Sequence, residues 1–239
     1  MKKYLASFIV LFVTGVIFNI NSASANVNNE NISKKNIELR EWVDKDGEVY
    51  FTTDAPLEND KDAEYIQSLL LNNFNHPING IQNDSIQPAS ENSKSYWTRN
   101  SITNTDSLGK VLWKTSGYSE KAMLAPVTAD KMYVDNGSVT VTYTGSGKAD
   151  KIVSGYSYEF NGITASISAY PTLSTSSQIV SWISQPVSDV TSLSYTSRWA
   201  YATSRVHLSN VELNVYGDVY KGSKIYNPRG YEKIYWLSN

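Results

Sequence analysis

The chain has 239 residues, a formal net charge of −2, two histidines and no cysteine. Without cysteine it can form neither a disulfide framework nor a thiolate metal site, and without a basic cluster it has little attraction for nucleic acid. Its content of tyrosine, serine and threonine is typical of a β-rich extracellular protein, and we expect neither a cofactor nor a bound metal.

Residues 1–25 have the pattern of a secretory signal peptide. Two lysines follow the first methionine, residues 4–20 are mostly apolar, and an Ala-x-Ala cleavage pattern ends at Ala25. A permanent membrane helix is the alternative, because the apolar run is just long enough to span a bilayer. Since no basic stop-transfer cluster follows the run, we expect cleavage and a secreted, extracellular product.

Charge and aromatic content divide the remaining chain into two parts. Residues 26–95 contain 13 acidic and 6 basic side chains, whereas residues 96–239 contain 10 acidic and 13 basic ones. The second part also contains 14 of the 17 tyrosines and 5 of the 6 tryptophans. We therefore expect an acidic N-terminal segment over 26–95 and a domain over 96–239 that holds the hydrophobic core.

The acidic segment is predicted to form a small hairpin followed by one helix. Leu39–Val43 is expected to return through Asp44–Gly47 into Glu48–Thr52, and Asp60 is expected to cap a helix that ends near Phe74. The apolar stripe of this helix consists of Ala63, Ile66, Leu70 and Phe74.

Two roles fit the acidic segment, which ends in a stretch of linker composition over 75–95. It is a pro-segment that shields the net-positive domain until it is removed, or it is a spacer with a little secondary structure. The spacer is favoured because a hairpin and one helix bury little surface by themselves.

Period-two alternation after residue 96 predicts eight to ten short antiparallel strands separated by turn signals. The clearest signal is Asn161-Gly162, a dipeptide that favours a two-residue type I′ hairpin turn. Such a turn would place Tyr158 opposite Ala165 on the next strand.

Three other segments also have turn chemistry. Asp135–Ser138 is expected to join Lys131–Val134 to Val139–Thr144 in a second hairpin, and Lys221–Lys224 and Asn227–Gly230 are expected to form tight turns. The sequence therefore predicts a mainly β protein. Its C-terminal domain is expected to be an antiparallel β-sandwich or a barrel, preceded by the hairpin-plus-helix acidic segment.

Motifs for the common catalytic routes are absent from the sequence. The two histidines are His76, in the predicted linker, and His207, in a predicted strand. The sequence contains no HExxH zinc motif, no GxSxG nucleophile elbow and no phosphate-binding loop. We therefore expect a protein that is not an enzyme.

Paired carboxylates leave one enzymatic alternative, a glycosidase. Two acidic side chains facing each other across a groove could serve as its acid and its nucleophile. The candidates at strand positions are Glu159, Glu212, Asp218 and Glu232.

The segment Ile163–Ser204 has an unusual composition. Serine and threonine make up 18 of its 42 residues, and its charged residues are Asp189 and Arg198. An amphipathic hairpin that inserts into a membrane, as in β-barrel pore-forming toxins, would have such a composition. A packed sheet with a hydroxyl-lined outer side is favoured, because Pro171 and Pro186 interrupt the segment.

Aromatic residues give the leading functional hypothesis. Exposed rings stack on sugars and pack in protein interfaces, and this domain has more rings than one small core requires. The candidate binding residues are Trp97, Trp113, Trp182, Trp199 and Trp236. We expect a binding module for a cell-surface glycan or a protein partner, with a secreted toxin or antibacterial effector that acts on membranes as the alternative.

Overall fold

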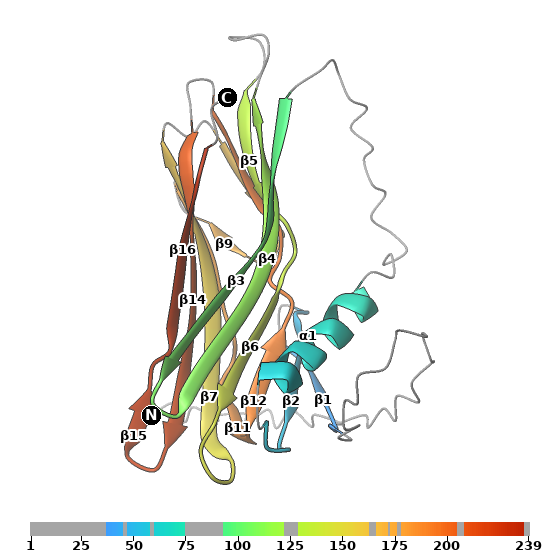
Figure 1. The fold of residues 1–239 in the computed structure, drawn as a ribbon, viewed down its shortest axis with the longest axis vertical. Coiled ribbons are helices and arrows are strands. Elements are labelled where there is room, and N and C mark those ends of the chain that lie inside the picture. The colour runs from blue at the N-terminus through green and yellow to red at the C-terminus, as the bar shows by residue number, and fades with distance from the viewer. Residues whose placement is uncertain are drawn as a thin grey trace, which may run out of the picture.

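The structure is a computed structural model that describes residues 37–44, 47–57, 60–74, 93–121, 129–162, 166–171, 173–175, 178–204 and 208–236. It is mainly β, and two antiparallel sheets pack against each other as a sandwich without closing into a barrel (Figure 1). The predicted sandwich is confirmed. The predicted signal peptide lies outside the described residues, among which no helix has the length and apolar character to cross a bilayer.

The chain contributes nine strands to sheet A and seven to sheet B. Sheet A consists of β1 (Arg40–Val43), β2 (Val49–Thr53), β3 (Ser93–Asp106), β4 (Gly109–Lys121), β5 (Asp130–Val134), β6 (Ser138–Tyr143), β8 (Ser166–Ala169), β12 (Ser192–Tyr195) and β13 (Ala200–Ser204). Sheet B consists of β7 (Ala149–Gly162), β9 (Ser174–Thr175), β10 (Ile179–Ile183), β11 (Val187–Val190), β14 (Leu208–Lys221), β15 (Lys224–Tyr226) and β16 (Arg229–Tyr235). The helix α1 (Asp60–Phe74) lies outside both sheets.

Three long strands organise the two sheets. Along one edge of β4 lie β6 and then β5, along one edge of β7 lie β11 and then β10, and along one edge of β14 lie β16 and then β15. Each pair of short strands runs in the same direction beside one long neighbour. The segment between the two short strands therefore bends the chain but does not reverse it.

The hairpin predicted at Asn161-Gly162 does not form. Ser166–Ala169 pairs with β13 in sheet A, while Tyr158 on β7 lies opposite Val180 and Leu213 in sheet B. A type I′ turn requires positive φ at both central residues. Among the described residues other than glycine, positive φ occurs only at Ser107 and Asp189, so Asn161 lacks it. Beyond Gly162 the chain changes sheets, and residues 163–165, including Ala165, lie outside the described residues.

The hairpin predicted around Asp135–Ser138 is also wrong. β5 and β6 do not pair with each other, because both pair with β4, as Gly117 opposite Val134 and Lys114 opposite Ser138 show. The tight turn predicted at Asn227–Gly230 is wrong as well, because this segment runs on along β14 from β15 into β16. The tight turn at Lys221–Lys224 is confirmed, since it joins β14 to β15.

The core between the sheets is rich in aromatic rings with satisfied polar groups. Its largest fully buried side chains include Trp113, Tyr156, Tyr158, Phe160 and Tyr195. The Tyr158 hydroxyl donates to the carbonyl of Arg198 at 2.8 Å, and the backbone N–H of Arg198 donates to the Tyr156 hydroxyl at 2.8 Å. The Tyr195 hydroxyl lies 2.8 Å from the Ser154 hydroxyl. These bonds offset the cost of burying the phenols.

The predicted hairpin and helix of the acidic segment are confirmed, and both contact the sandwich. β2 pairs with β1 on one side and with β12 on the other, so it is an interior strand of sheet A. Glu48 accepts a hydrogen bond from Nε of Arg198 at 2.9 Å, with both side chains almost fully buried. α1 packs on β6 and β12 (Figure 1).

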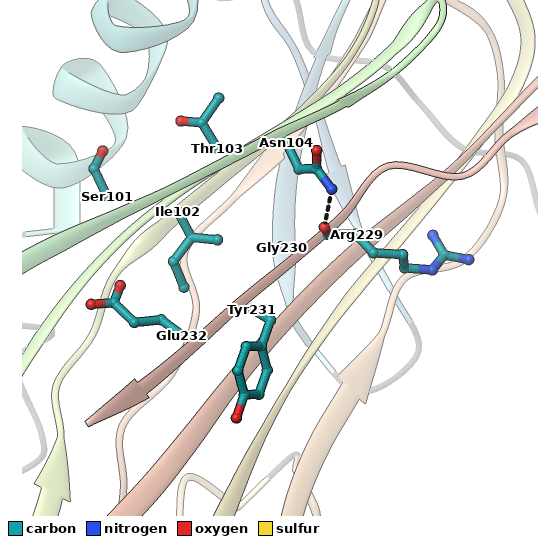
Figure 2. Close-up of a pocket in the computed structure, with 8 residues that line it drawn as sticks. All are labelled: Ser101, Ile102, Thr103, Asn104, Arg229, Gly230, Tyr231 and Glu232. Atoms are coloured by element: carbon teal, nitrogen blue, oxygen red, sulfur yellow. Dashed lines mark hydrogen bonds between the residues drawn. The ribbon is translucent and has the colours of Figure 1, made fainter. Parts of the chain in front are cut away.

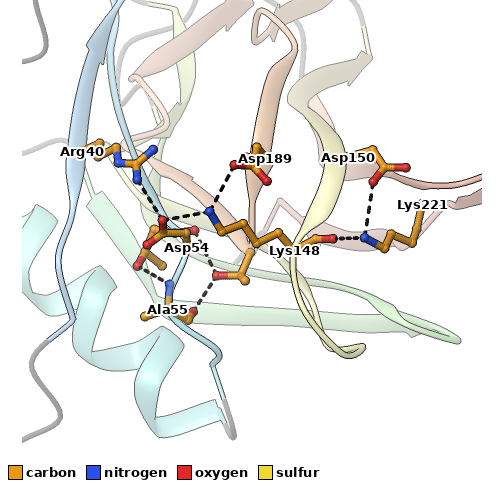
Figure 3. Close-up of polar contacts among 9 residues, drawn as sticks. Arg40, Asp54, Ala55, Lys148, Asp150, Asp189 and Lys221 are labelled. Atoms are coloured by element: carbon orange, nitrogen blue, oxygen red, sulfur yellow. Dashed lines mark hydrogen bonds and ion pairs between the residues drawn. The ribbon is translucent and has the colours of Figure 1, made fainter.

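Ion pairs at the opposite end of β2 add a second attachment, shown in Figure 3. Asp54 pairs with Arg40 at 2.8 Å and with Lys148 at 3.1 Å, and Lys148 also pairs with Asp189 at 3.1 Å. The hydrogen bond from Lys148 lowers the pKa of Asp54, and the same contact together with Asp189 raises the pKa of Lys148. These pairs link β1 to the turn between β6 and β7.

Candidate ligand-binding surface

The half of sheet A that contains β5, β8 and β13 carries a row of four tyrosines on its outer face. In the strand register Tyr96 on β3 lies opposite Tyr118 on β4, Tyr118 lies opposite Tyr133 on β5, and Tyr133 lies opposite Tyr201 on β13. These residues point outward because their neighbours along each strand, such as Met132, point into the core. We call Tyr96, Tyr118, Tyr133 and Tyr201 the tyrosine row.

The rings of the tyrosine row contact one another in sequence across the sheet. Their centroids are separated by 5.6 Å from Tyr96 to Tyr118, by 5.0 Å from Tyr118 to Tyr133 and by 6.4 Å from Tyr133 to Tyr201. Trp199 extends the row, since its ring stacks on Tyr201 at 6.1 Å with an interplanar angle of 17°. Tyr96, at the edge of the sheet, is 71% exposed.

Two lysines hold these rings in place. The ammonium of Lys131 lies 4.1 Å from the ring centroid of Tyr201 and within 5.9 Å of the centroids of Tyr133 and Tyr118. The ammonium of Lys94 lies 4.8 Å from the ring centroid of Tyr118. Cation–π attraction of this kind fixes the rings, so a ligand meets an ordered aromatic surface.

The phenols of Tyr118 and Tyr133 are neutral over the physiological pH range. Burial, followed by the charge of Glu120, raises the pKa of Tyr118, while burial and the charge of Asp135 raise the pKa of Tyr133. Both hydroxyls therefore remain donors as well as acceptors at neutral pH.

Small hydroxyl side chains continue the surface beyond the row. Ser168 on β8 lies opposite Tyr201, and the hydroxyls of Ser166 and Thr203 lie 2.6 Å apart. Such a combination of rings and hydroxyls suits ligands that present both apolar C–H faces and hydroxyl groups.

The structure does not bring the five candidate tryptophans together. Trp199 lies beside the tyrosine row, and Trp97 lies behind it, against Gly117, where an added Cβ would be 2.1 Å from the ring. Trp113 is fully buried in the core, so no ligand reaches its ring in the folded state. Trp182 packs 4.7 Å from Tyr195 at the margin of the core, and Trp236 is half-buried after β16.

Sequence reasoning missed the tyrosine row, although each tyrosine lies at an outward position of a recognisable alternation. The row depends on which strands are neighbours and on their register. Neither is encoded in the local pattern that made the individual strands recognisable.

The four candidate carboxylates do not form one site. Glu159 lies opposite Glu212 on the outer face of sheet B, where Lys233 donates to Glu212 at 2.7 Å. Asp218 is paired with Arg229 on the same sheet.

Glu232 lies elsewhere, in an open groove between β3 and β16 (Figure 2). Burial raises the pKa of this carboxyl. The groove has a volume of about 410 Å³, and of the eight residues lining it Glu232 alone carries a carboxylate. Ile102 packs against Gly230 there, and the amide of Asn104 donates to the carbonyl of Arg229.

Metal ligands do not cluster in the part of the chain that the structure describes, where no group of three or more His, Asp or Glu side chains is close enough to hold an ion. His76 and His207 lie outside the described residues. No protein-family model, no curated protein and no solved structure shows a significant match to the chain.

Proposed function

We propose that the protein is a secreted, noncatalytic binding protein that holds a cell-surface glycan on the tyrosine row and Trp199. The observation that carries this proposal is the register of four tyrosines on four neighbouring strands, next to a stacked tryptophan. An ordered, half-exposed aromatic surface of this kind loses little conformational entropy when it binds a ligand.

Two features favour a glycan over a protein partner. The rings are spaced by 5.0 to 6.4 Å across the strands, so a linear chain that lies along the row meets a new ring at regular intervals. The neutral phenols of Tyr118 and Tyr133 and the nearby serine and threonine hydroxyls offer donors and acceptors that match sugar hydroxyls. These hydroxyls belong to Ser166, Ser168 and Thr203.

The test is binding of the full mature chain to an array of immobilised oligosaccharides, followed by titration of the bound class. Tyr96→Ala and Tyr118→Ala are each expected to weaken binding by about tenfold or more, because each removes an aromatic ring on which the ligand stacks. Tyr118→Phe separates the ring from its hydroxyl, and we expect it to retain most of the affinity.

Tyr231→Ala is the matched control, because Tyr231 is an exposed tyrosine on sheet B. It is expected to leave the affinity unchanged. Binding that survives both alanine variants of the row would remove the tyrosine row from the proposal, and the absence of binding to every carbohydrate on the array would overturn it.

One observation favours a second candidate, a toxin that acts on membranes. β8 and β9, which belong to the hydroxyl-rich segment Ile163–Ser204, are the outermost strands of sheets A and B. A peripheral strand breaks few ladder hydrogen bonds when it leaves its sheet. Release of a trapped dye from lipid vesicles by micromolar protein would support this candidate, and intact vesicles would leave it without support.

A further inference from the structure

The other half of the outer face of sheet A is covered by α1 and lined mostly by hydroxyl side chains, with Phe51 and Leu112 as its apolar members. Outward positions on β6 and β12 alternate with core residues such as Val141 and Leu193. These outward residues are Ser138, Thr140, Thr142, Ser192 and Ser194, none of them more than 5% exposed. We call them the hydroxyl face. A helix that packs permanently on a sheet normally covers an apolar face, so this pairing is unusual.

Several polar atoms in this interface have no hydrogen-bond partner. The hydroxyls of Ser138 and Ser192 are buried and unpaired, and so is the side-chain oxygen of Gln67 on α1. On the same face, the hydroxyls of Thr140 and Ser194 lie 3.0 Å apart and bond to each other. An unpaired buried hydroxyl is stabilised when a polar group replaces the helix.

The apolar contribution of α1 is small where its side chains are described. Among residues 61–68 the buried ones are Ala63, Ile66 and Gln67, so Ile66 is the single large apolar anchor in that stretch. It belongs to a satellite cluster with Leu57 and Phe51, apart from the main core. Over residues 61–68 the helix therefore makes its large apolar contact through Ile66, above a face on which hydroxyl side chains predominate.

The hydroxyl face and the tyrosine row belong to one continuous surface. On β4 the outward residues include Lys114 and Tyr118, and Lys114 pairs with Glu64 of α1 at 3.4 Å. These two outward positions are four residues apart, or about 13 Å along the strand. α1 therefore reaches the strand that carries the second tyrosine of the row.

We propose that α1 is a displaceable cover and that the hydroxyl face beneath it extends the glycan-binding surface for a long, linear, hydroxyl-rich polysaccharide. This inference rests on the proposed function and adds a ligand class to it. A short oligosaccharide occupies the tyrosine row alone, whereas a longer chain displaces α1 and supplies the hydroxyl partners that Ser138 and Ser192 lack.

The first experiment compares two substitutions on opposite faces of α1 in the full mature chain. Ile66→Asp places a charge in the buried contact, whereas Tyr65→Asp places the same charge on the exposed face. The probes are a short and a long oligosaccharide of the class retained by the array. Ile66→Asp is expected to raise affinity for the long chain by at least about tenfold and to leave the short chain unchanged. Tyr65→Asp is expected to change neither.

A second pair of substitutions tests the hydroxyl face itself. Thr140→Val and Ser194→Val together remove two mutually bonded hydroxyls and add apolar surface beneath the helix. In the Ile66→Asp background they are expected to abolish the gain for the long chain. If the gain persists, the hydroxyl face is not part of the ligand surface and the inference fails.

Hydrogen exchange gives a readout that needs no ligand and separates this inference from the proposed function. We expect the α1 amides to exchange through a local opening, at denaturant concentrations where β6 and β12 remain protected. Exchange of α1 only with global unfolding would overturn the displaceable cover even if short oligosaccharides bind the row. This measurement also decides the question if Ile66→Asp does not fold.

Discussion

At the scale of single residues, the pair Glu48 and Arg198 shows how strongly the acidic segment depends on the sandwich. Their side chains are 6% and 9% exposed and lie 2.9 Å apart. The Arg198 guanidinium also lies 4.7 Å from the ring centroid of Tyr170. A buried charge without its partner is very costly, even though an intact buried pair adds little net stability.

Glu48→Gln is therefore expected to destabilise the protein by about 3–5 kcal/mol, because it leaves the buried guanidinium facing a neutral amide. The measurement is urea unfolding followed by tryptophan fluorescence. The double variant Glu48→Gln with Arg198→Met is expected to recover part of the loss. If the double variant is less stable by the sum of both single losses, the two side chains do not interact.

Gly117 is a second informative position, because β4 has no room there for a Cβ atom. A Cβ there would lie 2.0 Å from the carbonyl oxygen of Tyr133 and 2.1 Å from the Trp97 ring. Gly117→Ala is expected to cost about 1–3 kcal/mol through overpacking. We expect it also to weaken the proposed glycan binding, because β5 and its tyrosine must shift. A melting temperature within one degree of the native value, with unchanged binding, would contradict this expectation.

At the scale of elements, β2 behaves as an integral strand of sheet A whereas α1 does not. β2 is hydrogen-bonded to β1 and β12, and the Thr191 hydroxyl donates to the carbonyls of Thr53 and Ala55. Each unpaired buried hydroxyl under α1 costs about 1–3 kcal/mol, while burying Ile66 contributes about 1.5–3 kcal/mol. Among the side chains that the structure describes, the attachment of α1 is thus weaker than that of β2.

Cutting the chain between α1 and β3 is expected to leave the two pieces together. A protease site placed between residues 77 and 92 allows the cut, and size-exclusion chromatography at low and physiological salt measures the outcome. The ladder between β2 and β12 and the buried pair of Glu48 with Arg198 hold the pieces. Elution of a free N-terminal fragment would contradict both attachments and would argue against a shielding role.

The ion pairs at the end of β2 predict a dependence on pH. Because Lys148 and Arg40 lower the pKa of Asp54, its contribution is complete above the ordinary carboxyl pKa of 3.8 and is lost as pH falls through the lowered value. The difference in urea midpoint between the native protein and Asp54→Asn should be constant from about pH 5 to 8 and should shrink at lower pH. Glu41→Gln, on the exposed face of β1, is the control, and a difference that grows with acid would contradict the assignment.

At the scale of the whole molecule, long antiparallel strands join distant parts of the chain. β14 pairs with β7 over twelve register positions, and β2 pairs with β12 across roughly 140 intervening residues. Such pairings require closure of long loops before they gain contacts, which slows folding.

Refolding from urea is accordingly expected to take milliseconds to seconds, as in other β-sandwiches. It is also expected to be the same with and without a reducing agent, because the chain has no cysteine. Stopped-flow fluorescence measures both quantities. Folding within microseconds would mean that local contacts dominate, against the register observed here.

Much of the fold was predictable from local pattern. Alternation identified most strands, the apolar stripe identified α1, and the tight turns at Asp44–Gly47 and Lys221–Lys224 were recognisable from their residues. At the candidate site, the sequence placed Trp199 among the binding residues but not the four tyrosines beside it.

The sequence alone determined that the chain forms amphipathic strands around an aromatic core without crosslinks, because side-chain alternation is a local property. Only the tertiary structure decided that neither Asn161-Gly162 nor Asn136-Gly137 closes a hairpin. The chain passes from sheet B to sheet A after Gly162, and it continues along β4 in the same direction at Asn136-Gly137. The reason is physical: turn propensity is worth about a kilocalorie at one position, whereas pairing along strands such as β4 and β7 gains hydrogen bonds and buried area over 13 and 14 residues. The tyrosine row also depends on strand pairing, because its members become neighbours only through the register of β3, β4, β5 and β13.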